Sequence, residues 1–167
     1  MGTVATVVLA LALIATYLTW TASRMDRLHA RTDTARAALD AQLVRRAAAA
    51  LEIASARGLE SLREAAAAGY HSDDVDREAT ESALSVAIRS AAPSLDAHDN
   101  AELIDAGRRV VLARQFYNDA VRDTRAFRER RVVRALRLVG HAKEPQRFEI
   151  DDTPPISDGT VSSPLTT

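Results

Sequence analysis

The sequence predicts an all-α protein in which an N-terminal transmembrane helix continues into an elongated antiparallel bundle of three to four helices. Three observations predict this fold class. No charged side chain occurs from Met1 to Ser23. Apolar and small residues then recur at steps of three and four, as they do on one face of a helix. The apolar share of 47% consists largely of alanine, with only 4% aromatic residues, which favours closely packed helices.

The composition also restricts the function. With 167 residues, the chain has room for one domain and a tail. Its net charge of −1 gives no basic field for nucleic acid, so we expect no nucleic-acid partner. The absence of cysteine removes disulfides, thiolate metal sites and lipid-modified cysteines from consideration.

Residues 1–23 are predicted to form an uncleaved membrane anchor. The stretch "VATVVLALALIATYLTW" is apolar apart from its threonines, and about 20 such residues span a hydrocarbon core as a helix. A cleaved signal peptide is the alternative, but no basic residue precedes the apolar run. In addition, Trp20 stands where a signal peptide requires small residues. We therefore expect a single-pass protein of the cell membrane, with the lipid bilayer as a partner.

The flanks of this segment predict its orientation. Tyr17 and Trp20 suit the aromatic belt at a membrane interface. Three arginines follow at once, namely Arg24, Arg27 and Arg31. By the positive-inside rule the bulk of the chain is cytoplasmic, although Asp26 and Asp33 interleave with these arginines and reduce the asymmetry.

The body of the chain reads as successive helices joined by short connections. The first is expected to run from the anchor to near Gly69, with a bend at Gly58. Its small and apolar face comprises Leu39, Leu43, Ala47, Ala50, Leu51, Ala54, Gly58, Leu62, Ala65 and Gly69. A second helix is expected from near Asp74 until Pro93 ends it. Its expected buried stripe is Val75, Ala79, Ala83, Val86, Ala87 and Ser90.

A third helix is expected to begin after Ser94 or Asp96. Its stripe is Leu103, Ala106, Val110, Ala113, Tyr117, Ala120, Val121 and Thr124. A short basic amphipathic helix follows at about 130–139 and carries Arg130, Arg131, Arg134 and Arg137. Such a helix either caps the bundle or lies on an anionic membrane surface or acidic partner. The tail, residues 142–167, is predicted to be mostly disordered, with "RFEI" docking on the bundle.

The stretch "ARQFYNDAVRD" raises a question of hydrogen bonding, because Tyr117 and Asn118 need partners if they are buried. Gln42, Arg45 and Arg46 in "LDAQLVRR" lie amid the apolar face of the first helix. If the first and third helices are antiparallel neighbours, we predict that Gln42 and Arg46 meet Tyr117 and Asn118 and fix the register. The alternative is that these residues bind a ligand.

No pattern in the sequence is typical of catalysis. The four histidines, His29, His71, His98 and His141, are far apart and read as surface or turn residues. The acidic run "DDVDRE" lacks the glycine and glutamate spacing of a calcium loop. There is no Gly-rich phosphate loop, nucleophile elbow or cysteine nucleophile. We therefore expect no enzyme, no cofactor and no metal.

Over roughly residues 1–150, the chain resembles the LemA family of bacterial membrane proteins. The family's third-helix signature is matched by Arg114, Tyr117, Asn118 and Val121, and its Leu-x-Arg-Arg pattern by Leu43, Arg45 and Arg46. The segment "KEPQRFEI" is a looser match. The chain departs from the family after Arg122, where "DTRAFRERRVVRAL" replaces a Phe-Pro turn.

The resemblance implies a single-pass membrane protein whose residues 24–141 form a LemA-like antiparallel helical domain, and it supplies no reaction. The favoured hypothesis is a non-catalytic scaffold that recruits other membrane or envelope proteins, with homo-oligomer formation left open. The alternative is an extracytoplasmic sensor in which Gln42, Arg46, Tyr117 and Asn118 line a pocket for an anion or a peptide carboxylate.

Overall fold

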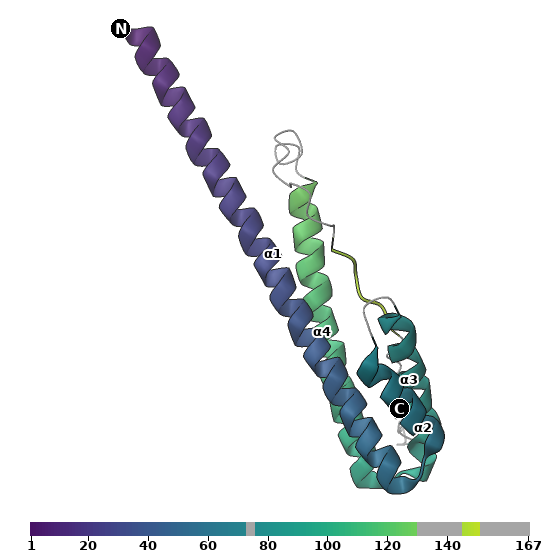
Figure 1. The fold of residues 1–167 in the computed structure, drawn as a ribbon. Coiled ribbons are helices and arrows are strands. Elements are labelled where there is room, and N and C mark those ends of the chain that lie inside the picture. The colour runs from purple at the N-terminus through teal and green to yellow at the C-terminus, as the bar shows by residue number, and fades with distance from the viewer. Residues whose placement is uncertain (73–75, 130–144, 151–167) are drawn as a thin grey trace, which may run out of the picture. The chain divides into compact units, whose positions relative to one another are not determined.

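The computed structural model describes residues 1–72, 76–129 and 145–150. Every regular element within these ranges is helical, so the chain is all-α as predicted (Figure 1). The helices are α1 (Gly2–Arg57), α2 (Glu60–His71), α3 (Arg77–Ala91), the 3₁₀ turn η1 (Ala92–Ser94) and α4 (Ala97–Arg128). The predicted basic helix at 130–139, with Arg130, Arg131, Arg134 and Arg137, lies outside the described residues, as does most of the predicted disordered tail.

The chain divides into two compact units. Unit 1 combines residues 1–41 with the chain from Leu112 to Phe148, and unit 2 combines Gln42–Val111 with Glu149 and Ile150. The helices α1 and α4 each contribute residues to both units. The polar residues singled out in the sequence are therefore divided, because Arg46 belongs to unit 2 whereas Tyr117 and Asn118 belong to unit 1.

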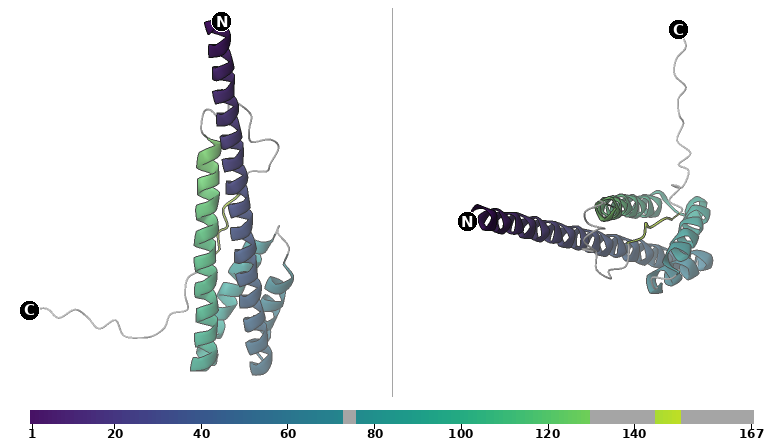
Figure 2. Two further views of the ribbon diagram at one scale, coloured as in Figure 1. Left: turned by 90° about the vertical axis from the view of Figure 1, so that its left-hand side faces the viewer. Right: turned by 90° about the horizontal axis from the view of Figure 1, so that it is seen from above.

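The N-terminal part of α1 is apolar and exposed. It is the one described helix that is long and apolar enough to cross a membrane, and none of its most apolar stretch is buried by the protein. Val8 is 60% exposed and Leu13 is 63% exposed, and the start of α1 extends beyond the end of α4 in both views of Figure 2. The hydroxyls of Thr6, Thr16 and Thr19 donate to carbonyls four residues earlier, so these polar groups are satisfied within the helix.

In unit 1, the next part of α1 packs against the C-terminal half of α4. The hydroxyls of Thr32 and Thr124 lie 3.0 Å apart, and both side chains are buried. Met25 packs on Phe127. The stripe predicted for the third helix is confirmed where it is fully buried, at Leu103, Val110, Tyr117, Ala120, Val121 and Thr124.

The prediction of one continuous helix to Gly69 is wrong, because the chain breaks at Gly58 and Leu59. Gly58 has a φ of +68°, which an L side chain rarely adopts. The N–H of Leu59 donates to the carbonyl of Ala54 at 2.9 Å and closes the end of α1. The chain then reverses, because a Cβ built on Gly69 would lie 3.6 Å from Cβ of Ala47. Gly58 therefore ends the helix instead of bending it.

The buried face of α3 also differs from the predicted stripe. Its buried residues are Glu81, Leu84, Ser85, Ile88 and Ala91, whereas Ala79, Ala83, Val86 and Ser90 of the predicted stripe are exposed. The prediction followed small apolar residues and did not include Glu81. Glu81 is buried with an arginine on α1 as its partner. The observed buried face lies nearly half a turn from the predicted one, at about 100° per residue.

Alanine together with leucine and isoleucine forms the core of unit 2. Its buried members are Ala47, Ala50, Ile53, Ala54, Leu62, Ala66, Leu84, Ile88, Ala91 and Leu103. As predicted, α3 ends just before Pro93 and α4 begins after Asp96. The Asp96 carboxylate accepts the N–H of Asp99 at 2.9 Å and so caps α4. This N–H, together with the guanidinium of Arg57, holds the pKa of Asp96 below its ordinary value.

Candidate functional site: two polar clusters

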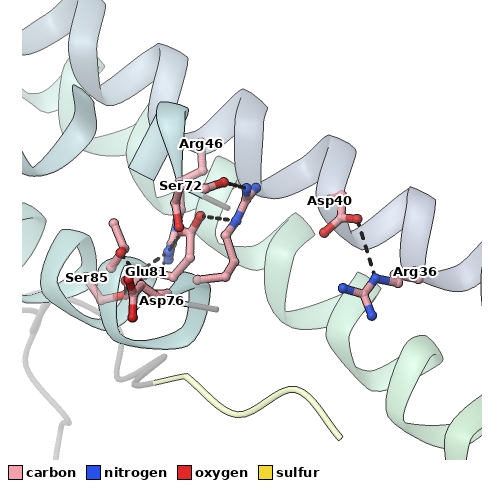
Figure 3. Close-up of polar contacts among 9 residues, drawn as sticks. Arg36, Asp40, Arg46, Ser72, Asp76, Glu81 and Ser85 are labelled. Carbon is pink, nitrogen blue, oxygen red and sulfur yellow. Dashed lines mark hydrogen bonds and ion pairs between the residues drawn. The ribbon is translucent and has the colours of Figure 1, made fainter. Parts of the chain in front are cut away.

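The first polar cluster lies in unit 2 and joins α1 to α3. Arg46 is 4% exposed and Glu81 is fully buried. Nη2 of Arg46 lies 2.6 Å from Oε2 of Glu81 and 3.2 Å from the Glu81 carbonyl oxygen. Nη1 of Arg46 donates to the Ser85 hydroxyl at 3.1 Å (Figure 3). One guanidinium therefore engages a carboxylate, a carbonyl and a hydroxyl on successive turns of α3.

A second arginine approaches the same carboxylate. Nε of Arg77 lies 3.3 Å from Oε1 of Glu81, and Nη1 of Arg77 donates to the carbonyl of Ser72 at 2.9 Å. Glu81 thus has a guanidinium facing each of its oxygens. Removing a carboxylate from water is costly unless charge and hydrogen bonds replace the lost hydration. Both guanidinium groups supply charge here, and Oε2 also accepts a hydrogen bond from Arg46. We interpret this cluster as a structural contact that holds α1 and α3 together within unit 2.

The second polar cluster lies in unit 1, where α4 meets an extended segment. We call residues 145–148 the strap; it is part of the yellow segment, residues 145–150, in Figure 2. The Tyr117 hydroxyl donates to the carbonyl of Gln146 at 2.8 Å. The Asn118 side chain donates to the carbonyl of Phe148 at 3.1 Å and accepts the Phe148 N–H at 2.9 Å. Nε of Arg125 donates to the carbonyl of Pro145 at 2.9 Å.

The Tyr117 phenol is held in its neutral form. Burial raises its pKa above the ordinary value, and the guanidinium of Arg36 on α1 offsets part of that rise. A neutral phenol carries the proton that it donates to Gln146, so the raised pKa and the hydrogen bond agree. Only 5% of Tyr117 is exposed.

The partners predicted for Tyr117 and Asn118 are therefore corrected. Both residues bond the backbone of the strap, whereas Arg46 bonds Glu81 and Ser85. An extended segment without a sheet partner leaves its N–H and C=O groups to be satisfied by side chains, which supplies the partners that the helical pattern could not reveal. The docking expected for "RFEI" is confirmed at Phe148.

The remaining predicted residues are dispersed. Gln42 and Arg114 are half-buried and Arg45 is exposed. Sequence reasoning missed Glu81, Ser85 and Arg125. For Glu81 a signal was available, because Arg77 and Glu81 have the i, i+4 spacing of an ion pair on a helix.

Among the described residues, no three His, Asp or Glu side chains are assembled in a way that could hold a metal ion. His71 and His98 are exposed and His29 is half-buried; His141 lies outside the described part. The groups that the sensor hypothesis offers to a ligand are engaged by the chain itself, Arg46 by Glu81 and Asn118 by the strap.

Comparison of the chain with family models, with curated proteins and with solved structures gives no match. The resemblance to the LemA family therefore stays a prediction from the motifs around Arg46 and Asn118.

Proposed function

We propose that this chain is a non-catalytic, membrane-anchored helical scaffold of the bacterial LemA type, which holds its helical domain at the cell membrane and recruits other membrane or envelope proteins. The observation that carries the proposal is the exposure of the apolar start of α1. Apart from Leu18, the large apolar side chains from Val4 to Trp20 are about half or more exposed.

Burial in lipid gives this exposure a physical reason. Apolar surface left in water costs roughly 25 cal/mol per Å², and soluble monomers rarely expose a contiguous patch of this kind. In a bilayer the same side chains face hydrocarbon, and helical backbone needs no outside partner. The threonines of the segment do not oppose insertion, because their hydroxyls bond carbonyls of the same helix.

The motifs support the LemA assignment and the scaffold reading. Arg46, Tyr117 and Asn118 match the residues that the family signatures specify, and each makes a contact that holds one segment of the domain to another. These contacts favour a role in maintaining the fold over a role in a reaction. The same domain offers an exposed helical surface for partner proteins.

The orientation belongs to the same proposal. Arg24, Arg27 and Arg31 follow the apolar segment directly, and the positive-inside rule then directs the helical domain to the cytoplasm. Arg31 pairs with Asp123 on α4 at 3.0 Å, but both side chains are about half exposed, so the arginine keeps contact with solvent.

Membrane extraction tests the anchor. Membranes from cells that express the full chain are washed with alkaline carbonate, and the protein is expected to stay in the pellet. The double variant Leu11→Arg, Ile14→Arg is expected to lose this resistance, because a charged residue at the centre of a span costs about 3 kcal/mol. Ala37→Arg is the matched control, since Ala37 is also exposed on α1 but lies beyond the apolar stretch. Release of the unmodified chain by carbonate contradicts the proposal.

Orientation and recruitment need separate tests. The chain has no native cysteine, so a single cysteine introduced at Ser157 can be treated with a membrane-impermeant maleimide in intact cells. Labelling only after permeabilisation is expected; prompt labelling would favour the extracytoplasmic alternative. Gentle solubilisation should also recover the same membrane proteins in replicate purifications, and recovery of none counts against a scaffold.

A further inference from the structure

The strap is held through its backbone. Side chains of α4 bond main-chain atoms of the strap, namely the carbonyls of Pro145, Gln146 and Phe148 and the N–H of Phe148. The side chains of Gln146 and Arg147 are exposed, and Phe148 is only half-buried. The contacts therefore select an extended backbone more than they select particular side chains.

The spacing of the α4 residues matches an extended peptide. Asn118 and Arg125 are seven residues apart, which places them on one face of the helix and about 10 Å apart along its axis. Phe148 and Pro145 are three residues apart, and an extended chain covers about 10 Å over that distance. Arg125 bonds Pro145 and Asn118 bonds Phe148, so α4 and the strap run antiparallel.

The pattern of donors sets the requirements on the peptide. Toward the strap, Arg125 and Tyr117 act as donors, so the peptide offers carbonyls at the positions of Pro145 and Gln146. The amide of Asn118 both donates and accepts, so it pairs with the carbonyl and the N–H of one residue, as a neighbouring strand would. An N–H is needed at this one position, and proline fits at position 145 because its carbonyl alone is used.

We propose that Tyr117, Asn118 and Arg125 form a binding site for an extended peptide, which the chain's own residues 145–148 fill in the same molecule. The site does not depend on membrane anchoring. Because its contacts are to backbone, a separate peptide with the sequence of residues 143–150 occupies it when the strap is released. In the intact chain, this peptide competes with the strap.

The first test measures strap docking in the full chain in detergent micelles. Arg147, whose side chain is exposed, is replaced by cysteine and labelled with a fluorophore. High anisotropy that does not change with protein concentration is expected, and concentration dependence would overturn occupancy within the same molecule. Asn118→Leu should lower the anisotropy. Gln115→Leu, at an exposed amide on the same helix, should leave it unchanged. Equal anisotropy in both variants overturns the site.

The second test offers the peptide from outside. The full-length variant Phe148→Pro lacks the N–H that Asn118 accepts, so its strap should dissociate, whereas Phe148→Leu keeps the N–H. A labelled peptide of residues 143–150 is expected to bind Phe148→Pro saturably and Phe148→Leu much more weakly. Adding Asn118→Leu to Phe148→Pro should weaken peptide binding roughly tenfold or more, the effect of two lost hydrogen bonds. Unchanged affinity overturns the proposal. Circular dichroism confirms that each variant remains helical.

Discussion

The two polar clusters solve the same problem in different ways. In unit 2, Arg46 and Glu81 pair charge with charge inside the core, and both side chains are almost fully buried. In unit 1, Tyr117 and Asn118 pair neutral groups with the backbone of an extended segment. A closed pair of charges depends on one partner of opposite sign. Side chains that bond a backbone accept any chain in the correct conformation. The first polar cluster therefore suits a permanent contact, and the second polar cluster suits a contact that can be exchanged.

The largest predicted effect comes from breaking the charged pair. Glu81→Leu leaves the Arg46 guanidinium buried without its carboxylate, which should lower the free energy of unfolding by about 3–5 kcal/mol. Chemical denaturation of the chain in detergent micelles measures the change. A loss below about 1 kcal/mol would mean that the pair is not buried as described.

A double variant separates charge from packing. Arg46→Met with Glu81→Leu replaces the pair by apolar groups of similar size, so it should recover much of the stability that Glu81→Leu loses. If the double variant is as unstable as Glu81→Leu, the loss comes from packing at position 81 and the charged pair is not its cause.

Breaking the second polar cluster, between α4 and the strap, should give a smaller effect. Asn118→Leu removes two hydrogen bonds to Phe148, and the half-buried groups of the strap regain water when it dissociates. We expect a loss of about 1–2 kcal/mol, together with faster hydrogen exchange at the Phe148 amide. Native exchange at Phe148 in this variant would show that the strap is held by other contacts.

The hydrogen bond from Arg46 to the neutral Ser85 hydroxyl gives the third effect. Ser85→Ala removes the hydroxyl that accepts from Nη1 of Arg46 but leaves the contact with the Glu81 carboxylate. The expected loss is about 1 kcal/mol, again from chemical denaturation. A loss as large as that of Glu81→Leu would assign the stability to the serine instead of the carboxylate.

The smallest effect is a pH dependence of the stability that Tyr117 contributes to the second polar cluster. Because burial raises the pKa of Tyr117, the stability from its neutral phenol is fully present below the ordinary tyrosine pKa of about 10 and is lost as the pH rises through the raised value. Subtracting the phenolate absorbance of Tyr117→Phe from that of the unmodified chain at each pH gives the titration curve of Tyr117. The midpoint of this curve should therefore lie above pH 10. A midpoint at or below 10 would contradict the buried donor.

The sequence predicted much of this fold, and the errors have physical causes. The stripe of α4 from Val110 to Thr124 was predicted well because its buried face is apolar or weakly polar. The face of α3 was predicted wrongly because Glu81 is buried only when Arg46 on another helix is present, and periodicity along one segment carries no information about that partner. Gly58 was noticed, but its positive φ depends on the reversal that packs Gly69 near Ala47.

The candidate site was found only in part for a similar reason. Tyr117 and Asn118 were identified as groups that need partners, and "RFEI" as a segment that docks. Their hydrogen-bond partners are N–H and C=O groups of an extended backbone. Such unpaired backbone groups have no sequence signature. The helical pattern instead suggested Gln42 and Arg46 as partners, since only helices were considered as neighbours.

Cysteine accessibility along α1 tests the membrane anchor most directly. Leu13 and Ala37 are both exposed in the structure, so the protein shields neither position and only a bilayer can make them differ. Single-cysteine variants at the two positions are treated with a polar maleimide in open membrane fragments, before and after detergent is added. Ala37→Cys is expected to react at once, and Leu13→Cys is expected to react only in detergent. Equal reaction at both positions without detergent would contradict the anchor.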